Sequence, residues 1–267
     1  MYPLALNEDA LGKILRQLKR FIKARVQSAN ARGAVVALSG GVDSSVVAVL
    51  AHDVVDTKAL IFPESGVTSA QDVLDATSIA EAYKLPFTII EINDLVNCFK
   101  ESSKPILPAH TLGRLSTAEA NLKPRIRMAL NYVASNADRR LVLGTGNRTE
   151  LLTGYFTKYG DGGVDALPIG CLYKTQVFQL ARHINIPERI ISKAPSAGLW
   201  LGQTDEEELG ISYSLLDRIL CELIDKKKTA EETAQLVGVE SHQVQRIYEQ
   251  VLRAQHKRRA PLVAQIR

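Results

Sequence analysis

The strongest constraint on the fold is an alternation of two kinds of segment over the first 145 residues. Short apolar runs of strand length occur at residues 34–38, 59–62, 87–92 and 141–144. Helical hydrophobic spacing and helix start signals occur over residues 8–29, 43–53, 70–83 and 125–134. Strands that are joined through helices run parallel, and a parallel sheet is covered on both faces. We therefore predict an α/β fold with a doubly wound parallel sheet.

The last third of the chain carries only helical signals. Thr204 and Thr229 each precede acidic residues at capping-box spacing, which predicts that a helix begins after each. The segment 229–251 also has the outline of helix, glycine turn and helix that occurs in DNA-reading motifs. Its second helix carries a single arginine, Arg246, before Arg253, which is too little positive charge for a surface that lies in a groove. We therefore interpret the segment as packing helices.

Composition excludes several classes of protein. The chain has 267 residues, 46% of them hydrophobic, and a formal net charge of +4, which does not by itself indicate a nucleic-acid partner. The cysteines Cys98, Cys171 and Cys221 are far apart, with no C-x-x-C pair, so neither a zinc site nor a disulfide framework is expected. No apolar run approaches the roughly 20 residues of a membrane span, and the N-terminus has no signal-peptide pattern. We expect a cytoplasmic protein.

The segment S-G-G-V-D-S-S follows the first predicted strand and opens the next predicted helix. Backbone amides and the hydroxyls of Ser39, Ser44 and Ser45 are suited to bind an anion there, at the positive end of a helix dipole. A phosphate loop of the Walker type would place a lysine after its last glycine, but this segment has Asp43 instead. A carboxylate beside a phosphate is favourable when Mg²⁺ lies between them. The alternative is a plain turn in which Asp43 caps a helix.

This segment resembles the pyrophosphate loop of the ATP pyrophosphatases, which split ATP between its α- and β-phosphates. The run from Leu143 to Val177, which includes G-T-G-N-R-T-E and Y-G-D-G-G-V-D, is similar to the signature of the NAD synthetases. The likeness extends from about residue 10 through P-S-A-G-L-W-L-G-Q-T-D-E-E-E-L-G to His256-Lys257-Arg258. The resemblance implies a ligase that joins ammonia to the nicotinate carboxylate of deamido-NAD through an adenylate, giving NAD, AMP and pyrophosphate.

The resemblance also implies the architecture. It implies a single domain over 1–267 with the fold of the adenine nucleotide alpha hydrolases. Within that domain we expect an N-terminal helix at 8–30, an ATP pyrophosphatase core at 31–200 and a helical part with a tail at 204–267.

Site residues follow from the same resemblance, position by position. Mg²⁺ would be held by Asp43 and Glu150, and the catalytic residues would be Lys174 and Asp161, the latter placing the incoming ammonia. The residues that would contact ATP are Ala37, Leu38, Ser39, Gly40, Gly41, Val42, Asp43, Ser44, Thr145, Lys174 and Ser196. The residues that would bind deamido-NAD are Arg125, Lys158, Asp165, His256 and Lys257.

The sequence also bears on the nitrogen source, the oligomeric state and the alternative functions. The chain has no room for an amidase domain, so we expect free ammonia as the nitrogen source, with a separate glutaminase subunit as the alternative source. We expect a homodimer, since the predicted helical faces offer more apolar surface than one sheet covers. The alternative functions are another ATP pyrophosphatase, such as a tRNA-modifying enzyme, and a non-catalytic adenine-nucleotide binder. We expect neither a nucleic-acid nor a membrane partner.

Overall fold

The structure is a computed structural model that describes residues 3–107 and 117–266. Its sheet has the strand order β3-β2-β1-β4, and every pairing is parallel, as predicted. The central strand β1 places Val36 opposite Ala59 of β2 on one side and Leu143 of β4 on the other. The four strands are β1 (Gly33–Ala37), β2 (Thr57–Ile61), β3 (Phe87–Ile89) and β4 (Arg140–Leu143).

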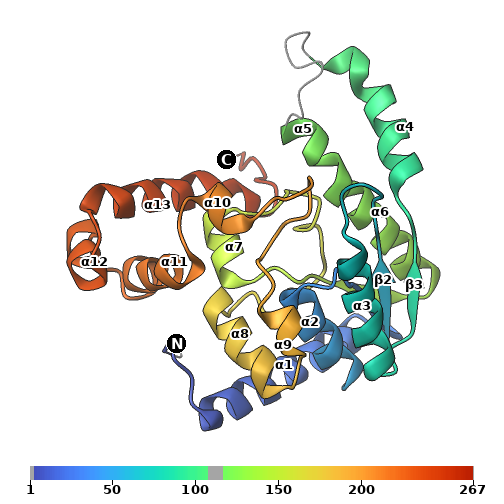
Figure 1. The fold of residues 1–267 in the computed structure, drawn as a ribbon, viewed down its shortest axis with the longest axis horizontal. Helices are drawn as coiled ribbons and strands as arrows, with labels where there is room; N and C mark the ends of the chain where they lie inside the picture. Colours follow the sequence, from blue (N-terminus) through green and yellow to red (C-terminus); the bar gives the residue numbers. More distant parts are fainter. Residues whose placement is uncertain (1–2, 108–116, 267) are drawn as a thin grey trace.

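Helices make up most of the remaining chain (Figure 1). The first seven are α1 (Glu8–Ser28), α2 (Val42–His52), α3 (Ala70–Ala82), α4 (Asn93–Ser103), α5 (Thr117–Ala120), α6 (Leu122–Ala137) and α7 (Arg148–Thr153). The next six are α8 (Lys174–His183), α9 (Glu188–Ile191), α10 (Asp205–Leu209), α11 (Tyr213–Leu220), α12 (Ala230–Val237) and α13 (Ser241–Arg253). Short 3₁₀ or π turns lie at Lys104–Ile106, Cys221–Asp225 and Ala254–Lys257.

The predicted elements agree with the structure to within a few residues, with two differences. The third strand ends at Ile89 instead of residue 92, because its neighbour β2 ends at Ile61, although the amides of Ile90 and Ile92 still donate to the carbonyls of Ile61 and Pro63. The helix α4, which the sequence analysis did not predict, begins directly afterwards. The predicted capping box at Thr204 is wrong, since its side chain caps no amide, whereas the box at Thr229 is confirmed.

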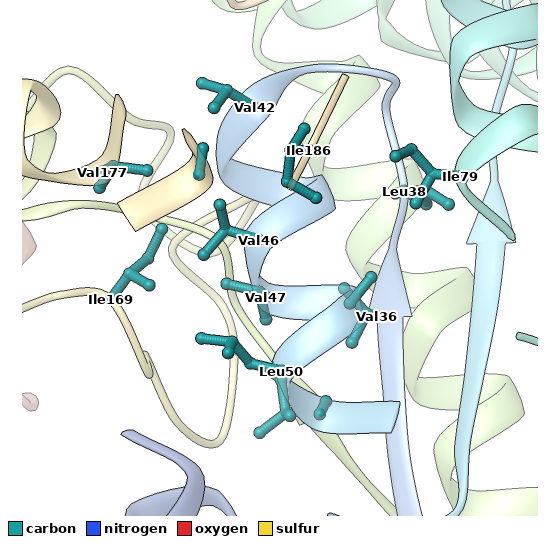
Figure 2. Close-up of a cluster of buried hydrophobic side chains, with 14 of the residues drawn as sticks. Val36, Leu38, Val42, Val46, Val47, Leu50, Ile79, Ile169, Val177 and Ile186 are labelled. Carbon is teal, nitrogen blue, oxygen red and sulfur yellow. The ribbon is translucent and has the colours of Figure 1, made fainter. Parts of the chain in front are cut away.

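Each face of the sheet buries alternate residues of the strands, as the period of two requires. Val36 and Leu38 belong to the cluster on the face that is covered by α2, and Figure 2 shows Val36 near Val47 and Leu38 near Ile79. That face also packs against α1, α3 and α8, through a cluster of which Figure 2 draws 14 residues. Val35 belongs to the opposite face, which packs against α4 and α6. The sheet is therefore covered on both faces, as predicted.

A second core lies in the C-terminal part of the chain. Leu216 and Ile219 of α11, Val237 of α12, and Val244 and Ile247 of α13 form one buried cluster. The segment that resembled a DNA-reading motif thus buries its apolar faces within the chain, which agrees with the packing interpretation. Among residues 3–107 and 117–266, no helix has the length and apolar character that crossing a membrane requires.

Candidate active site

The candidate site lies where the sheet changes its direction of winding. From β1 the chain proceeds outward through β2 to β3, and it then returns to place β4 on the other side of β1. The loops that follow β1 and β4 therefore diverge at adjacent carboxyl ends, which in open α/β sheets leaves a crevice for ligands. The loop after β1 leads into α2, and the loop after β4 leads into α7. This topology brings Asp43 of α2 and Glu150 of α7 to one place.

The loop after β1 is held in shape by its own serines. The Ser39 amide donates to Ser44 Oγ at 3.1 Å, and Ser44 Oγ donates to the Gly41 carbonyl at 3.0 Å. Ser45 Oγ donates to the same carbonyl at 2.8 Å and is fully buried. The prediction that Ser45 offers its hydroxyl to an anion is therefore wrong, since that hydroxyl is buried and stabilises the loop through the Gly41 carbonyl.

Asp43 stands in the first turn of α2 and has two partners from distant segments. Its Oδ2 forms an ion pair with Lys174 Nζ at the start of α8, and its Oδ1 accepts a hydrogen bond from Asn147 Nδ2 at 3.1 Å. Lys174 is buried, and burial alone would lower its pKa. The carboxylates of Asp43 and Glu150 outweigh that effect, so the pKa of Lys174 is raised. The lysine is therefore a fixed positive charge between two negative ones.

Glu150 completes this charged group. It closes a capping box at the start of α7, where Asn147 Oδ1 accepts from the Glu150 amide at 3.1 Å and Glu150 Oε2 accepts from the Asn147 amide at 3.1 Å. Burial, together with the nearby carboxylate of Asp43, raises the pKa of Glu150 well above its usual range. The ionised form of Glu150 is therefore disfavoured by its surroundings, and a bound cation would favour it.

A buried carboxylate on α11 fixes the two helices that carry Glu150 and Lys174. Asp217 is fully buried and accepts from Thr149 Oγ1 at 2.5 Å, from the Thr175 amide at 2.8 Å and from Thr175 Oγ1 at 2.7 Å. Thr149 Oγ1 in turn accepts from the Lys174 amide at 3.0 Å. Asp217 thus joins the N-terminal turns of α7 and α8 through the immediate chain neighbours of Glu150 and Lys174.

Two cavities meet at this site. The first, the loop cavity, has a volume of about 550 Å³ and is lined by the loop after β1 together with Glu150, Lys174 and Asp205. The second, the tail cavity, has a volume of about 580 Å³ and is lined by residues of α6 together with Phe156 and Lys257. Some residues line both cavities and so mark their junction: Ala37, Ser39, Arg127, Thr145, Tyr155, Asp161, Ser196, Ala197, Trp200 and Gln203.

The residues assigned to ATP, to the metal and to catalysis converge on the loop cavity, except for Gly40. Gly40 is buried behind the loop, where its carbonyl accepts from Lys193 Nζ at 3.2 Å. The others line the cavity wall: Ala37, Leu38, Ser39, Gly41, Val42, Asp43, Ser44, Thr145, Glu150, Asp161, Lys174 and Ser196.

The residues assigned to deamido-NAD are only partly brought together. Lys257 lines the tail cavity, where its Nζ donates to the carbonyls of Gly154 at 2.7 Å and Phe156 at 2.8 Å. The other four line neither cavity, but each is the chain neighbour of a residue that lines the tail cavity. The pairs are Arg125 and Pro124, Lys158 and Thr157, Asp165 and Val164, and His256 and Lys257. Arg125, Asp165 and His256 are exposed, which places them on the surface around this cavity.

Several cavity residues were not predicted from the sequence, among them Lys193, Asp205 and Arg127. Lys193 pairs with Asp72 at 2.7 Å and Asp75 at 2.6 Å, and so ties the loop to α3. Asp205 is buried, accepts from Tyr213 Oη at 2.8 Å, and lies close enough to Lys174 to influence its pKa. Arg127, on α6, lines both cavities. No local spacing in the sequence indicates these three residues, because their contacts are made between segments that are far apart in the chain.

A parallel sheet with a glycine-rich loop and two carboxylates at its switch point defines a nucleotide-binding α/β protein. A family model described as NAD synthase matches residues 14–261. The NH(3)-dependent NAD(+) synthetase of Archaeoglobus fulgidus is 50% identical over 259 residues, covering 96% of this chain and 97% of the relative.

Two solved structures have the same fold. The NMN synthetase from Francisella tularensis is similar with 33% identity and a TM-score of 0.83, covering 96% of this chain and 99% of that one. The NH3-dependent NAD synthetase from Campylobacter jejuni is similar with 28% identity and a TM-score of 0.78, with the same coverage. The chain belongs to the NAD synthase family.

The first testable prediction concerns the backbone of the loop. Gly40 and Gly66 have the same φ of +81°, but a Cβ on Gly40 would lie 2.2 Å from the Asp72 carbonyl oxygen, whereas a Cβ on Gly66 would contact nothing within 4 Å. Gly66→Ala should cost about 1–2 kcal/mol of unfolding free energy through φ strain alone. Gly40→Ala should cost about 1–3 kcal/mol more, because backbone must move. Urea unfolding of both variants measures this, and equal costs would contradict the close approach.

The second prediction concerns the charge on Glu150. Because its pKa is raised, the ionised form is disfavoured in the folded state, and this cost is present above the usual pKa of 4.5 and absent below it. Glu150→Gln should therefore raise the unfolding free energy of the ligand-free protein at pH 7.5 by about 1 kcal/mol or more, with no gain at pH 4.

The control for this prediction is Glu81→Gln, a change at an exposed glutamate of α3, which should stay within about 0.5 kcal/mol of the wild type. A Glu150→Gln variant that is less stable at pH 7.5 would show that Glu150 supports the fold by its charge.

Proposed function

We propose that this protein is an NH3-dependent NAD synthetase that converts deamido-NAD to NAD at the expense of ATP. The observation that carries the proposal is the charged group of Asp43, Glu150 and Lys174 at the loop cavity, in a chain that is 50% identical over nearly its full length to a relative of that name. The products would be NAD, AMP and pyrophosphate.

Mg²⁺ fits the residues of the loop cavity. Asp43 and Glu150 supply carboxylate oxygens, which are the ligands that this hard cation prefers, and the pKa of Glu150 is raised by burial and then by the nearby charge of Asp43. No group of three or more metal-ligating side chains is present in the described part of the chain. Two carboxylates suit a Mg²⁺ ion that takes its other ligands from ATP phosphates and water. Bound there, the ion would neutralise the pyrophosphate that leaves.

The chain's own groups would place the phosphates for attack. The loop after β1 precedes the N-terminus of α2, where backbone amides and the helix dipole favour an anion. Lys174 lies next to Asp43 and would turn its ammonium toward the phosphates once a cation takes over that carboxylate. It would then stabilise negative charge that develops at the α-phosphate when the substrate carboxylate attacks.

Asp161 would serve the second half of the reaction, in which ammonia displaces AMP. It lies at the junction of the two cavities, and its carboxylate accepts from the Thr157 amide at 2.8 Å. Desolvation by the surrounding protein raises the pKa of Asp161 although its side chain is partly exposed to the cavity, and the raised pKa makes it a better proton acceptor. We propose that it attracts ammonium and takes up the proton that is released when the C–N bond forms.

The tail cavity would hold the nicotinate end of deamido-NAD. Phe156 offers an aromatic surface there, and Lys257 Nζ lies 5.4 Å from the centroid of that ring. The four assigned residues on the surrounding surface, Arg125, Lys158, Asp165 and His256, would then meet the rest of the dinucleotide. This assignment is supported by their position around the cavity mouth and by the charges that they carry.

A homodimer remains part of the proposal, although the reason given from the sequence is wrong. The apolar faces of α1, α11 and α13 are buried within the chain itself, so they do not need a second subunit to cover them. Exposed apolar side chains gather instead on β3, α4 and α6, where Ile89 is 47%, Phe99 51% and Val133 65% exposed. We propose that this surface pairs with a second copy, and that free ammonia is the nitrogen source.

The third prediction tests the function directly. The purified protein, given ATP, Mg²⁺, ammonium and deamido-NAD, should form NAD, AMP and pyrophosphate in equal amounts, measured by chromatography. Nicotinate mononucleotide should be tested in parallel, because the Francisella tularensis structure is that of an NMN synthetase. If only the mononucleotide is amidated, it is the substrate in place of deamido-NAD. If neither compound is amidated, the proposal is contradicted.

Variants in the same assay test the assigned carboxylates. Asp43→Asn and Glu150→Gln should each lower NAD formation at least 100-fold, because each removes a charge from the Mg²⁺ and phosphate site. The matched control is Asp53→Asn, which changes the aspartate at the opposite end of α2. This control should leave turnover unchanged.

The fourth prediction separates the two halves of the reaction. Asp161→Asn should raise the KM for ammonium at least tenfold and slow amide formation, whereas pyrophosphate release in a single turnover should change much less. The reason is that the carboxylate acts on ammonia only after the adenylate has formed. An unchanged ammonium KM would leave Asp161 as a turn residue that accepts the Thr157 amide.

A further inference from the structure

Arg127 occupies a position that neither the loop nor the signature residues explain. It lies on α6 and lines both the loop cavity and the tail cavity, next to Asp161, Thr145 and Ser196 at their junction. Among the described residues, no hydrogen bond or ion pair engages its guanidinium group. Its side chain is only partly exposed, and an arginine with limited access to water and no such partner is costly, since charged side chains are rarely buried unless they are paired. Its position therefore indicates an anionic ligand.

The surrounding charges do not satisfy this arginine. The carboxylates near enough to influence it are those of Glu64 and Asp161, and burial still lowers its pKa in spite of both. Glu64 already pairs with Lys123 Nζ at 2.9 Å, and both side chains are buried. Asp161 already accepts the Thr157 amide and also interacts with the charge of Lys257. Neither carboxylate is dedicated to Arg127.

The junction is the place where two anions must meet if the proposed function is right. The α-phosphate of ATP would approach from the loop cavity, and the nicotinate carboxylate would approach from the tail cavity. In adenylation, a carboxylate oxygen forms a bond to the α-phosphorus while the bond from that phosphorus to the bridging oxygen breaks. The electron pair leaves with pyrophosphate, and no proton is transferred. Two negatively charged groups repel each other on approach, so a cation at this point lowers the barrier.

We propose that Arg127 is a catalytic residue of the adenylation step, which contacts the α-phosphate and the substrate carboxylate as they meet. A guanidinium group suits this role better than an ammonium group, because its planar fork donates to two oxygens at once. Lys174 and the loop hold the phosphates from the loop cavity. Arg127 acts from the opposite wall, where α6 faces both cavities.

This inference rests on the proposed function, and a single-turnover experiment tests the two separately. Wild-type protein, Arg127→Gln and Arg127→Lys are mixed with saturating ATP, Mg²⁺ and deamido-NAD, and pyrophosphate is measured by rapid quench. Arg127→Gln should release pyrophosphate at least 100-fold more slowly, and Arg127→Lys about tenfold more slowly. Arg32→Gln is the control, since Arg32 is exposed, pairs with Asp138 and precedes β1 at the other end of the sheet.

Three further measurements separate catalysis from folding and binding. Arg127→Gln should unfold at a urea concentration no lower than that of the wild type, because it removes an unpaired enclosed charge. Its Kd for ATP should stay within threefold, and its KM for ammonium should not change, since ammonia enters later. A single-turnover rate of Arg127→Gln within threefold of the wild type, or a defect that saturating substrates abolish, would overturn the inference. Failure of the wild type to release pyrophosphate would instead overturn the proposed function.

Discussion

The ion pair between Asp43 and Lys174 is the interaction on which the site depends. Burial and the nearby carboxylate of Asp43 raise the pKa of Glu150, and the buried ammonium of Lys174 partly compensates for these effects. An isolated buried charge would cost several kcal/mol, so the three groups are held only as a set. We infer that the lysine holds the site ready for a metal-bound nucleotide.

Contacts outside the cavity fix the positions of these charged side chains. Asp217 is contributed by α11, which belongs to the C-terminal core, and it fixes the first turns of α7 and α8 at once. The capping box of Asn147 and Glu150 fixes the side chain of Glu150 on α7. The helical C-terminal part therefore supports the geometry of the nucleotide site as well as contributing Lys257 to the tail cavity. A functional site supported in this way is preorganised for its ligand.

The sequence could predict much of this arrangement. The alternation of strands and helices gave the parallel sheet, and the loop at Ser39 to Ser44 lies where the pattern placed it, at the start of α2. The residues assigned to ATP and the metal converge on one cavity apart from Gly40, because the loops after β1 and β4 open at the same edge of the sheet. The edge strand was predicted too long, since its partner β2 ends at Ile61 and the later hydrogen bonds of Ile90 and Ile92 do not extend the ladder of paired strands.

By itself the sequence determined the local features: which segments alternate between faces, where the loop breaks a strand, and where a capping box begins a helix. These depend on neighbouring residues, so their spacing records them. Only the tertiary structure decided that α6 presents Arg127 to both cavities and that α11 places Asp217 behind α7 and α8. It also decided that the hydroxyl of Ser45 faces inward. Such contacts join segments that are far apart in the chain, and their geometry is set by strand order and packing, which no local spacing records.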